Sequence, residues 1–132
     1  MKNTIKFLMA AIFAAVMLLG CRTSEGVDEV RTISTIQDDG NKYCIYDQKG
    51  KKVNCVKRSI GFLEGFGSDW FVVSNTKKIS LYNIKGKKYK TMSISSVGEV
   101  SSVGSYSFVT RKNGKLITYD KYGKKINSRK VR

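Results

Sequence analysis

Short runs in which apolar and polar residues alternate fill the chain from Val30 onward. A period of two is typical of half-buried β-strands, and Gly, Asn and Asp separate the runs as turn residues. No window in this part of the chain has the 3.6-residue apolar period of an amphipathic helix. The pattern therefore predicts an all-β, antiparallel domain of about eleven short strands. They are expected near residues 31–36, 42–47, 52–57, 60–64, 70–75, 78–83, 88–94, 97–102, 106–111, 115–120 and 124–130.

The same pattern repeats within the chain. The segment 59–72 matches 96–109 without a gap, at a spacing of 37 residues, and keeps both the glycines and the hydrophobic positions. The register continues from 79–83 to 116–120, and an earlier copy lies at 43–47, 36 residues before the middle one. The chain thus contains two full repeats and one partial repeat. Fixed spacing of this kind indicates a repeat architecture.

Each repeat contains a hairpin with the same turn chemistry. The turns are Asp47-Gln48-Lys49-Gly50, Asn83-Ile84-Lys85-Gly86 and Asp120-Lys121-Tyr122-Gly123. Asp or Asn at the first position can accept hydrogen bonds from turn amides, and Gly at the fourth position accepts a positive φ. We assign these acidic and amide residues a structural role, because lysines surround them and disfavour a metal ion. Repeated glycines at 61, 65, 67, 98 and 104 are expected to mark bulges or tight bends.

Four strands in about 37 residues resemble one blade of a β-propeller. The Tyr-Asp-x-x-Gly-Lys-Lys hairpin at residues 46–52 is also similar to the hairpin of bacterial WG-type β repeats. The resemblance implies blade-like sheets but no particular activity. A propeller needs at least about four blades, and this chain has room for about three. Three closures are therefore open: a single-chain sandwich or barrel, which is the simplest, a homodimeric six-bladed ring, or an open array capped by a partner.

The N-terminus has a different pattern. An apolar run, Phe7 to Leu19, follows the cations Lys2 and Lys6. A charged start and a run of about 13 apolar residues are typical of a secretory signal peptide and too short for a membrane-spanning helix. The run ends in Leu-Leu-Gly-Cys at residues 18–21, which resembles the lipobox of bacterial lipoproteins. An ordinary secreted protein or an uncleaved N-terminal anchor are the alternatives.

The lipobox resemblance implies cleavage before Cys21, a lipid on its sulfur and an acyl chain on its new amine. We accordingly divide the chain into a signal peptide (1–20), a lipidated N-terminus and tether (21–29) and a β-repeat domain (30–132). The expected location is the cell envelope, lipid-anchored. Arg22 follows the cysteine, which favours the outer membrane if the source is Gram-negative.

The charge is unevenly distributed. From residue 40 onward there are 21 Lys and Arg against five Asp and Glu, a net charge of +16. Such a field attracts anionic partners. For an envelope protein these are anionic lipid, lipopolysaccharide or wall polymer, whereas nucleic acid is not expected at that location. Solubility alone is the alternative explanation.

Nine lysines, here called the hairpin lysines, flank the three turns. Because repeats place equivalent residues at equivalent positions, we expect them to share one rim, where they and Tyr122 at a hairpin tip would bind the partner. The alternative is that they protect exposed hairpins from aggregation. The hairpin lysines are Lys49, Lys51, Lys52, Lys85, Lys87, Lys88, Lys121, Lys124 and Lys125.

The remaining chemistry is limited. The chain has no histidine, so the usual general base and the commonest metal ligand are missing. Cys44 and Cys55 are left as an even pair in an oxidising compartment and are predicted to form a disulfide. One bulge after the first turn would place Cys55 opposite Tyr43, whereas a tighter turn would place the two cysteines opposite each other.

No catalytic residue, metal site or cofactor is expected. The carboxylates Glu64, Asp69 and Glu99 are the candidates for a glycosidase pair, and they have no matching pattern between repeats. The strand aromatics are expected to pack in the core rather than to form a carbohydrate-stacking surface. These aromatics are Trp70, Phe71, Tyr82, Phe108 and Tyr119.

The sequence therefore favours a non-enzymatic envelope lipoprotein. Its basic β-repeat domain would bind an anionic envelope component or a protein partner, while its lipid holds it to the membrane. The alternative is a structural accessory subunit that completes or caps a larger envelope complex or a propeller ring, as a homo-oligomer or with another envelope protein.

Overall fold

The computed structural model describes residues 30–131. The repeat domain forms a compact unit over Arg31–Arg132. The predicted signal peptide, the lipidation site Cys21 and the tether lie outside the described residues. The structure thus describes the β-repeat domain alone.

The described residues contain 11 antiparallel strands, as the alternating pattern predicts. Four strands agree with the predicted ranges to the residue, and the boundaries of the others shift by one or two positions. Two single-turn helices, which the pattern did not predict, join consecutive sheets: the 3-10 turn η1 (Arg58–Ile60) and α1 (Ile94–Val97). The strands are β2 (Ile33–Asp38), β3 (Lys42–Asp47), β4 (Lys52–Lys57), β5 (Phe62–Phe66), β6 (Trp70–Ser74), β7 (Lys78–Asn83), β8 (Lys88–Ser93), β9 (Glu99–Val103), β10 (Ser107–Lys112), β11 (Lys115–Asp120) and β12 (Lys125–Lys130).

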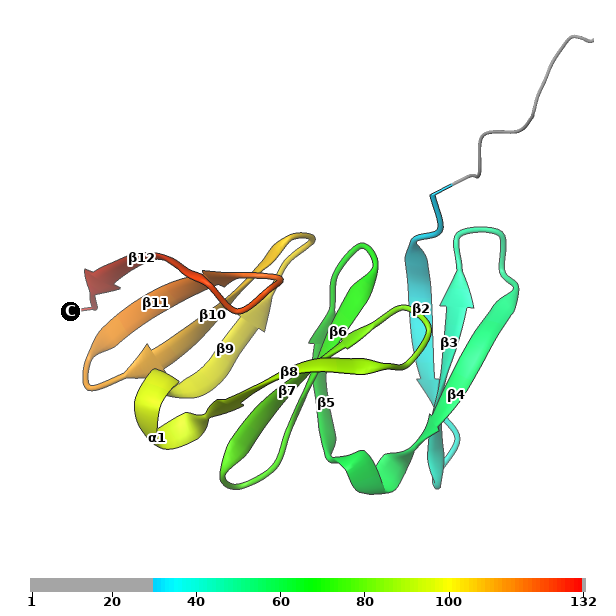
Figure 1. Ribbon diagram of the computed structural model, residues 1–132, viewed down its shortest axis with the longest axis horizontal. Coiled ribbons are helices and arrows are strands. Elements are labelled where there is room, and N and C mark those ends of the chain that lie inside the picture. The colour runs from blue at the N-terminus through cyan, green and yellow to red at the C-terminus, as the bar shows by residue number, and fades with distance from the viewer. Residues whose placement is uncertain (1–29, 132) are drawn as a thin grey trace, which may run out of the picture. The chain divides into compact units, whose positions relative to one another are not determined.

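The strands form three separate sheets, one for each repeat (Figure 1). Blade 1 has the order β2-β3-β4, blade 2 has β5-β6-β7-β8 and blade 3 has β9-β10-β11-β12. Each is a simple meander in which neighbours in sequence pair antiparallel. The sheets are thus blade-like, and within residues 30–131 the strands do not join into one closed barrel, which was part of the simplest closure considered.

Blade 2 buries both of its faces. One face packs into a cluster with blade 3 that contains Trp70, Val72 and Phe108. The other face packs into a cluster with blade 1 that contains Phe71 and Val73. This explains why the β6 sequence is a continuous apolar run rather than an alternating one: a strand that is covered on both sides needs apolar residues at every position.

The strand aromatics lie in these two clusters, as predicted. Phe71 stacks on Tyr82 with ring centroids 5.1 Å apart, and Phe108 stacks on Tyr119 at 5.4 Å, which are equivalent cross-strand pairs in blades 2 and 3. The Trp70 indole N–H donates to the Ser105 carbonyl in blade 3 over 2.8 Å. All five rings are at least 93% buried. They offer no surface for stacking a carbohydrate.

The last strand of each blade, here called its outer strand (β4, β8 and β12), carries a bulge just after its hairpin. In blade 1, Tyr46 pairs with Lys52 and Ile45 with Asn54, which leaves Val53 without a cross-strand partner. The same shift occurs at Tyr89 in β8 and at Ile126 in β12. Bulges bend a strand and redirect a side chain. The three bulge residues are consequently equivalent in position, although the sequence comparison did not identify them.

The repeated glycines do mark bends and close approaches. Gly61 and Gly98 end the two short helices at φ of 140° and 95°. Gly67 and Gly104 are equivalent residues. Gly67 donates its N–H to the carbonyl of Trp70, the first residue of β6, and Gly104 donates to that of Ser107, the first residue of β10. Their surroundings differ. A Cβ added at Gly67 would lie 2.1 Å from the Trp70 indole nitrogen, whereas one at Gly104 would meet nothing nearer than 3.5 Å.

We predict that Gly67→Ala destabilises the domain by about 2 kcal/mol or more, because the new methyl must displace the Trp70 ring or the backbone of blade 3. Gly104→Ala, the matched control, should change stability by less than about 0.5 kcal/mol. Urea unfolding followed by tryptophan fluorescence measures both. Equal stability of the two variants would mean that blades 2 and 3 are not packed closely at this point.

Candidate functional site

The three hairpin turns have the same hydrogen bonds. In each, the glycine N–H donates to the backbone carbonyl of the Asp or Asn three residues earlier, over 2.9 Å. The side-chain Oδ1 of that Asp or Asn accepts two further backbone N–H groups, at 2.9 to 3.1 Å. The glycines have φ between 81° and 86°. The structural role assigned to Asp47, Asn83 and Asp120 is thus confirmed.

The second turn packs on the outer strand of blade 1. A Cβ at Gly86 would lie 2.7 Å from a methyl group of Val56, and the Asn54 side-chain amide donates to the Lys85 carbonyl over 2.7 Å. Ile84, the second residue of this turn, packs against the blade 1 cluster. The turn that carries three lysines is therefore held in place from below by β4.

The third turn packs on blade 2 in the same way. A Cβ at Gly123 would lie 3.1 Å from the Lys90 side chain and 3.3 Å from the Met92 sulfur. The Tyr89 hydroxyl donates to the Lys121 carbonyl. The second and third hairpins thus each contact the preceding blade. The β3–β4, β7–β8 and β11–β12 turns follow one another along the array (Figure 1).

Eight of the nine hairpin lysines are exposed. Lys121 is the exception, with 21% of its side chain exposed. Its ammonium nitrogen lies 2.9 Å and 3.2 Å from the two carboxylate oxygens of Asp69 in blade 2. This hydrogen bond raises the pKa of Lys121. Lys121 therefore joins blades 2 and 3, and its charge is already compensated within the chain.

Tyr122 is 65% exposed at its hairpin tip, where the sequence placed it. Its ring centroid lies 6.5 Å from that of Tyr89, and the Lys121 ammonium lies 5.3 Å from it. These residues line a shallow cavity of about 190 Å³ together with Asp69, Trp70 and Asn83. Partial burial, and then the charge of Asp69, raises the pKa of Tyr89 to about 12.

The first turn has an additional ion pair. Asp47 is buried, and its Oδ2 accepts hydrogen bonds from Arg31 Nη2 at 3.1 Å and Arg31 Nε at 3.3 Å. The backbone N–H of Lys51, followed by the Arg31 side chain, holds the pKa of Asp47 below its ordinary value, although burial opposes the shift. The carboxylate thus remains ionised to a lower pH than that of an ordinary Asp.

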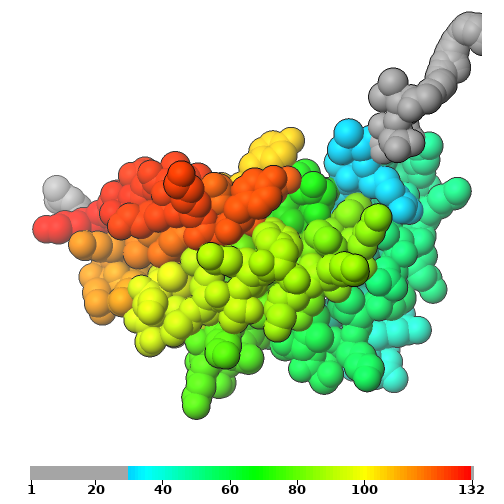
Figure 2. Space-filling model, in the orientation of Figure 1, coloured from blue at the N-terminus to red at the C-terminus, as the bar shows by residue number. Residues whose placement is uncertain are grey.

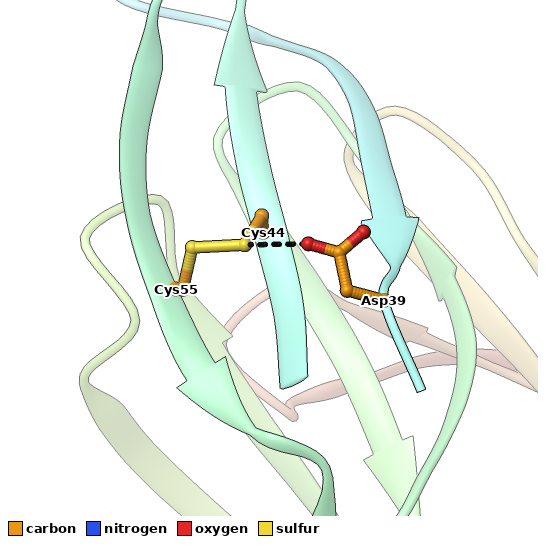
Figure 3. The surroundings of a disulfide bond; sticks show 3 residues. All are labelled: Asp39, Cys44 and Cys55. Carbon is orange, nitrogen blue, oxygen red and sulfur yellow. Dashed lines mark hydrogen bonds between the residues drawn. A yellow bond between two sulfur atoms is a disulfide. The ribbon is translucent and has the colours of Figure 1, made fainter. Parts of the chain in front are cut away.

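The predicted disulfide is present between Cys44 in β3 and Cys55 in β4 (Figure 3). The two residues are directly opposite in the ladder, with Cα atoms 4.0 Å apart. The four-residue turn and the bulge at Val53 together produce this register, because unbroken pairing from Tyr46 and Lys52 would place Cys55 opposite Tyr43. The expectation that one bulge places Cys55 opposite Tyr43 is therefore wrong, and no tighter turn is needed to align the two cysteines. An Asp39 carboxylate oxygen lies 3.6 Å from the Cys44 sulfur, a contact in which the oxidised sulfur has no proton to donate.

The three carboxylates considered for catalysis are divided between two places. Glu64 and Glu99 line a cavity of about 470 Å³, with Phe62 and Ser74 beside them. Glu64 accepts a hydrogen bond from the Ser74 hydroxyl. Asp69 is instead paired with Lys121. Within residues 30–131, no group of three or more His, Cys, Asp or Glu side chains could hold a metal ion.

Three residues that organise this region were not singled out as binding or interface residues in the sequence. Asn54 and Tyr89 fix the following hairpin, and Asp69 neutralises Lys121. For Asn54 and Tyr89 the signal was the alignment of the outer strands, in which Val53, Tyr89 and Ile126 take the same position and Asn54 matches Asn127. Hydrophobic periodicity alone hides such positions, because a bulge shifts the inward and outward alternation by one residue.

No protein-family model matches the chain, and no curated protein sequence matches it. None of the helices in the described part of the chain is long and apolar enough to cross a membrane.

We predict that Asp47→Asn makes the domain less sensitive to acid. A carboxylate whose folded pKa is lowered adds stability above its unfolded pKa of about 3.9, and this stability is lost as the pH falls through the folded pKa. An amide keeps the turn, as Asn83 does in blade 2, but it does not titrate. The variant should therefore start less stable at neutral pH and lose less stability on acidification.

Urea unfolding at several pH values between about 7 and 2 measures this difference. Asp120→Asn is the control, since Asp120 accepts the same two turn amides and forms no ion pair with an arginine in the part of the chain that the structure describes. The pH dependence of stability should differ less from wild type in Asp120→Asn than in Asp47→Asn. If Asp47→Asn and wild type lose equal stability on acidification, the Arg31–Asp47 pair is not the acid-sensitive contact.

Proposed function

We propose that this protein is a non-enzymatic, lipid-anchored envelope protein whose hairpin lysines bind an anionic envelope component. The observation that carries the proposal is the exposure of eight lysines on three equivalent turns, in a domain with a large excess of positive charge. Candidate ligands share one chemistry: phosphate or carboxylate groups spaced along a surface, as in anionic lipid, lipopolysaccharide or wall polymer.

The turn geometry supports binding through the lysine side chains. In all three turns the backbone N–H groups of the third, fourth and fifth residues already donate to the Asp or Asn side chain or to its carbonyl, so they are not available to cradle an anion. The ammonium groups are left as the contacts. They are flexible point charges on long stems, which suits a distributed anionic surface better than one shaped ligand.

The predicted location rests on residues 18–21 and on the disulfide. A lipobox implies export, and a disulfide between Cys44 and Cys55 is what an oxidising compartment allows. The runner-up function is a structural accessory subunit of an envelope complex or propeller ring. The outer strand of blade 3, in which all six residues are exposed, favours that alternative.

We predict that Cys21 carries lipid and that residues 1–20 are removed. Intact mass spectrometry of the membrane fraction should give a chain that starts at residue 21 and carries the added mass of the lipid. Cys21→Ala should release the protein from the membrane or block its processing. A variant that fractionates and migrates like wild type would contradict the proposed anchor.

The hairpin lysines are tested by reversing three charges in one turn. Lys85→Glu/Lys87→Glu/Lys88→Glu alters three exposed side chains and leaves the Lys121–Asp69 pair intact. Each lysine near an anionic membrane contributes about 1 kcal/mol, so the loss of three should weaken binding by at least about tenfold. Binding to phosphatidylglycerol vesicles and to lipopolysaccharide is measured at low and physiological salt.

The control is Lys77→Glu/Lys78→Glu/Lys115→Glu. It changes the same net charge at the β6–β7 and β10–β11 turns, where all three side chains are also exposed. We expect a loss smaller than that of the hairpin variant. Equal losses would mean that only total charge matters. Unchanged binding in both would contradict the proposal and favour the accessory-subunit function.

A further inference from the structure

The two interfaces between blades are built by the same contact. In each, the bulge residue of an outer strand and residues after it support the glycine turn of the next hairpin. At the first interface, Asn54 donates to the Lys85 carbonyl, and Val53 and Ile84 pack in one cluster. At the second, Tyr89 donates to the Lys121 carbonyl, and Met92 lies against Gly123. An outer strand thus presents one donor and apolar side chains to the following turn; the donor follows the bulge in β4 (Asn54) and is the bulge residue itself in β8 (Tyr89).

The outer strand of blade 3 has the same bulge and the same following asparagine as β4. Ile126 is its bulge residue, equivalent to Val53, and Asn127 follows it as Asn54 follows Val53. Val53 is half-buried and packs against the same cluster as Ile84 of the next turn, whereas Ile126 is 60% exposed. All six residues of β12 are exposed. In Figure 2 the red segment at the C-terminal end of the chain lies uncovered on the side turned to the viewer.

The first hairpin has the complementary feature. Gly50 has the same turn conformation as Gly86 and Gly123, with φ of 81°. A Cβ at Gly86 or Gly123 would contact the preceding blade, but one at Gly50 would meet nothing within 4 Å. At one end of the array, the outer strand β12 therefore supports no hairpin turn within the described residues. At the other end, the turn glycine Gly50 has open space beside it.

We propose that β12 of one copy receives the Asp47–Lys51 hairpin of a second copy, so that chains associate head to tail. Ile126 would pack beneath the turn, and the Asn127 amide would donate to a turn carbonyl. This is the contact that the chain already uses twice internally. A heterologous contact of this kind forms a ring if the rotation closes and an extended row if it does not. The proposal is independent of anion binding.

Electrostatics gives this contact a recognisable signature. β12 carries Lys125, Arg129 and Lys130, and the first hairpin carries Lys49, Lys51 and Lys52, so both partners are cationic. Arg129 also stands where Val56 and Met92 stand in the other blades. Like charges oppose the association at low salt, and screening relieves them. Self-association should therefore strengthen as salt rises, whereas binding to an anionic surface should weaken.

The experiment uses the full lipidated chain in detergent. Sedimentation velocity at about 50 mM and about 500 mM salt measures its assembly. We expect larger species at the higher salt. Ile126→Lys should weaken the association by at least about tenfold, because a further positive charge replaces an aliphatic side chain between two cationic partners. Phe62→Lys is the control: Phe62 is 64% exposed, close to the 60% of Ile126, but it lies on the inner strand of blade 2.

Photo-crosslinking locates the contact. A photoreactive phenylalanine analogue at position 126 should give a copy-to-copy adduct whose peptide contains residues 47–51, and the analogue at position 62 should not. Monomers at both salt concentrations, adducts elsewhere on the second copy, or adducts only with another protein would each overturn the proposal. If self-association fails while the lysine variants still lose vesicle binding, anion binding stands alone.

Discussion

The packing of the second and third hairpin turns on the outer strand of the preceding blade is the contact on which this structure depends. It requires a turn that can approach closely, which glycine allows, and a strand whose bulge redirects one side chain toward that turn. Asn54 and Tyr89 then supply the hydrogen bonds that the turn carbonyls accept. Since the same turn carries the lysines, the contact that joins the blades also fixes where the charges lie.

The blades have unequal shares in this arrangement. Blade 2 buries two faces, one with Phe71 and Val73 and the other with Trp70 and Val72. Blades 1 and 3 each contribute one face to the described clusters. In repeat proteins, stability is approximately a sum of terms for each repeat and for each neighbour contact. Blade 1 has a disulfide and the Arg31–Asp47 pair in addition, and these strengthen the blade that has three strands rather than four.

Much of this fold could be predicted from the sequence, and the unpredicted part has a physical reason. Alternation and repeated turns predict the strands, and the even cysteine pair predicts the disulfide, because these signals are local or come from counting. The register beside Cys55 was left open, because no special residue in the sequence marks the bulge at Val53. The Lys121–Asp69 pair was missed because it joins residues 52 positions apart, and only the packing of two blades brings them together. Lipidation of Cys21 and a binding role for the lysines stay predictions.

Amide hydrogen exchange tests the dependence on the turn contact most directly. β8 and β12 are equivalent edge strands, and each bonds to a single neighbour in its sheet. They differ in that the third hairpin lies against β8. In dilute protein at low salt, we expect the amides of Lys88–Ser93 to exchange more slowly than those of Lys125–Lys130. Equal protection of the two strands would contradict the account, because the turn would then add nothing to the stability of the strand beneath it.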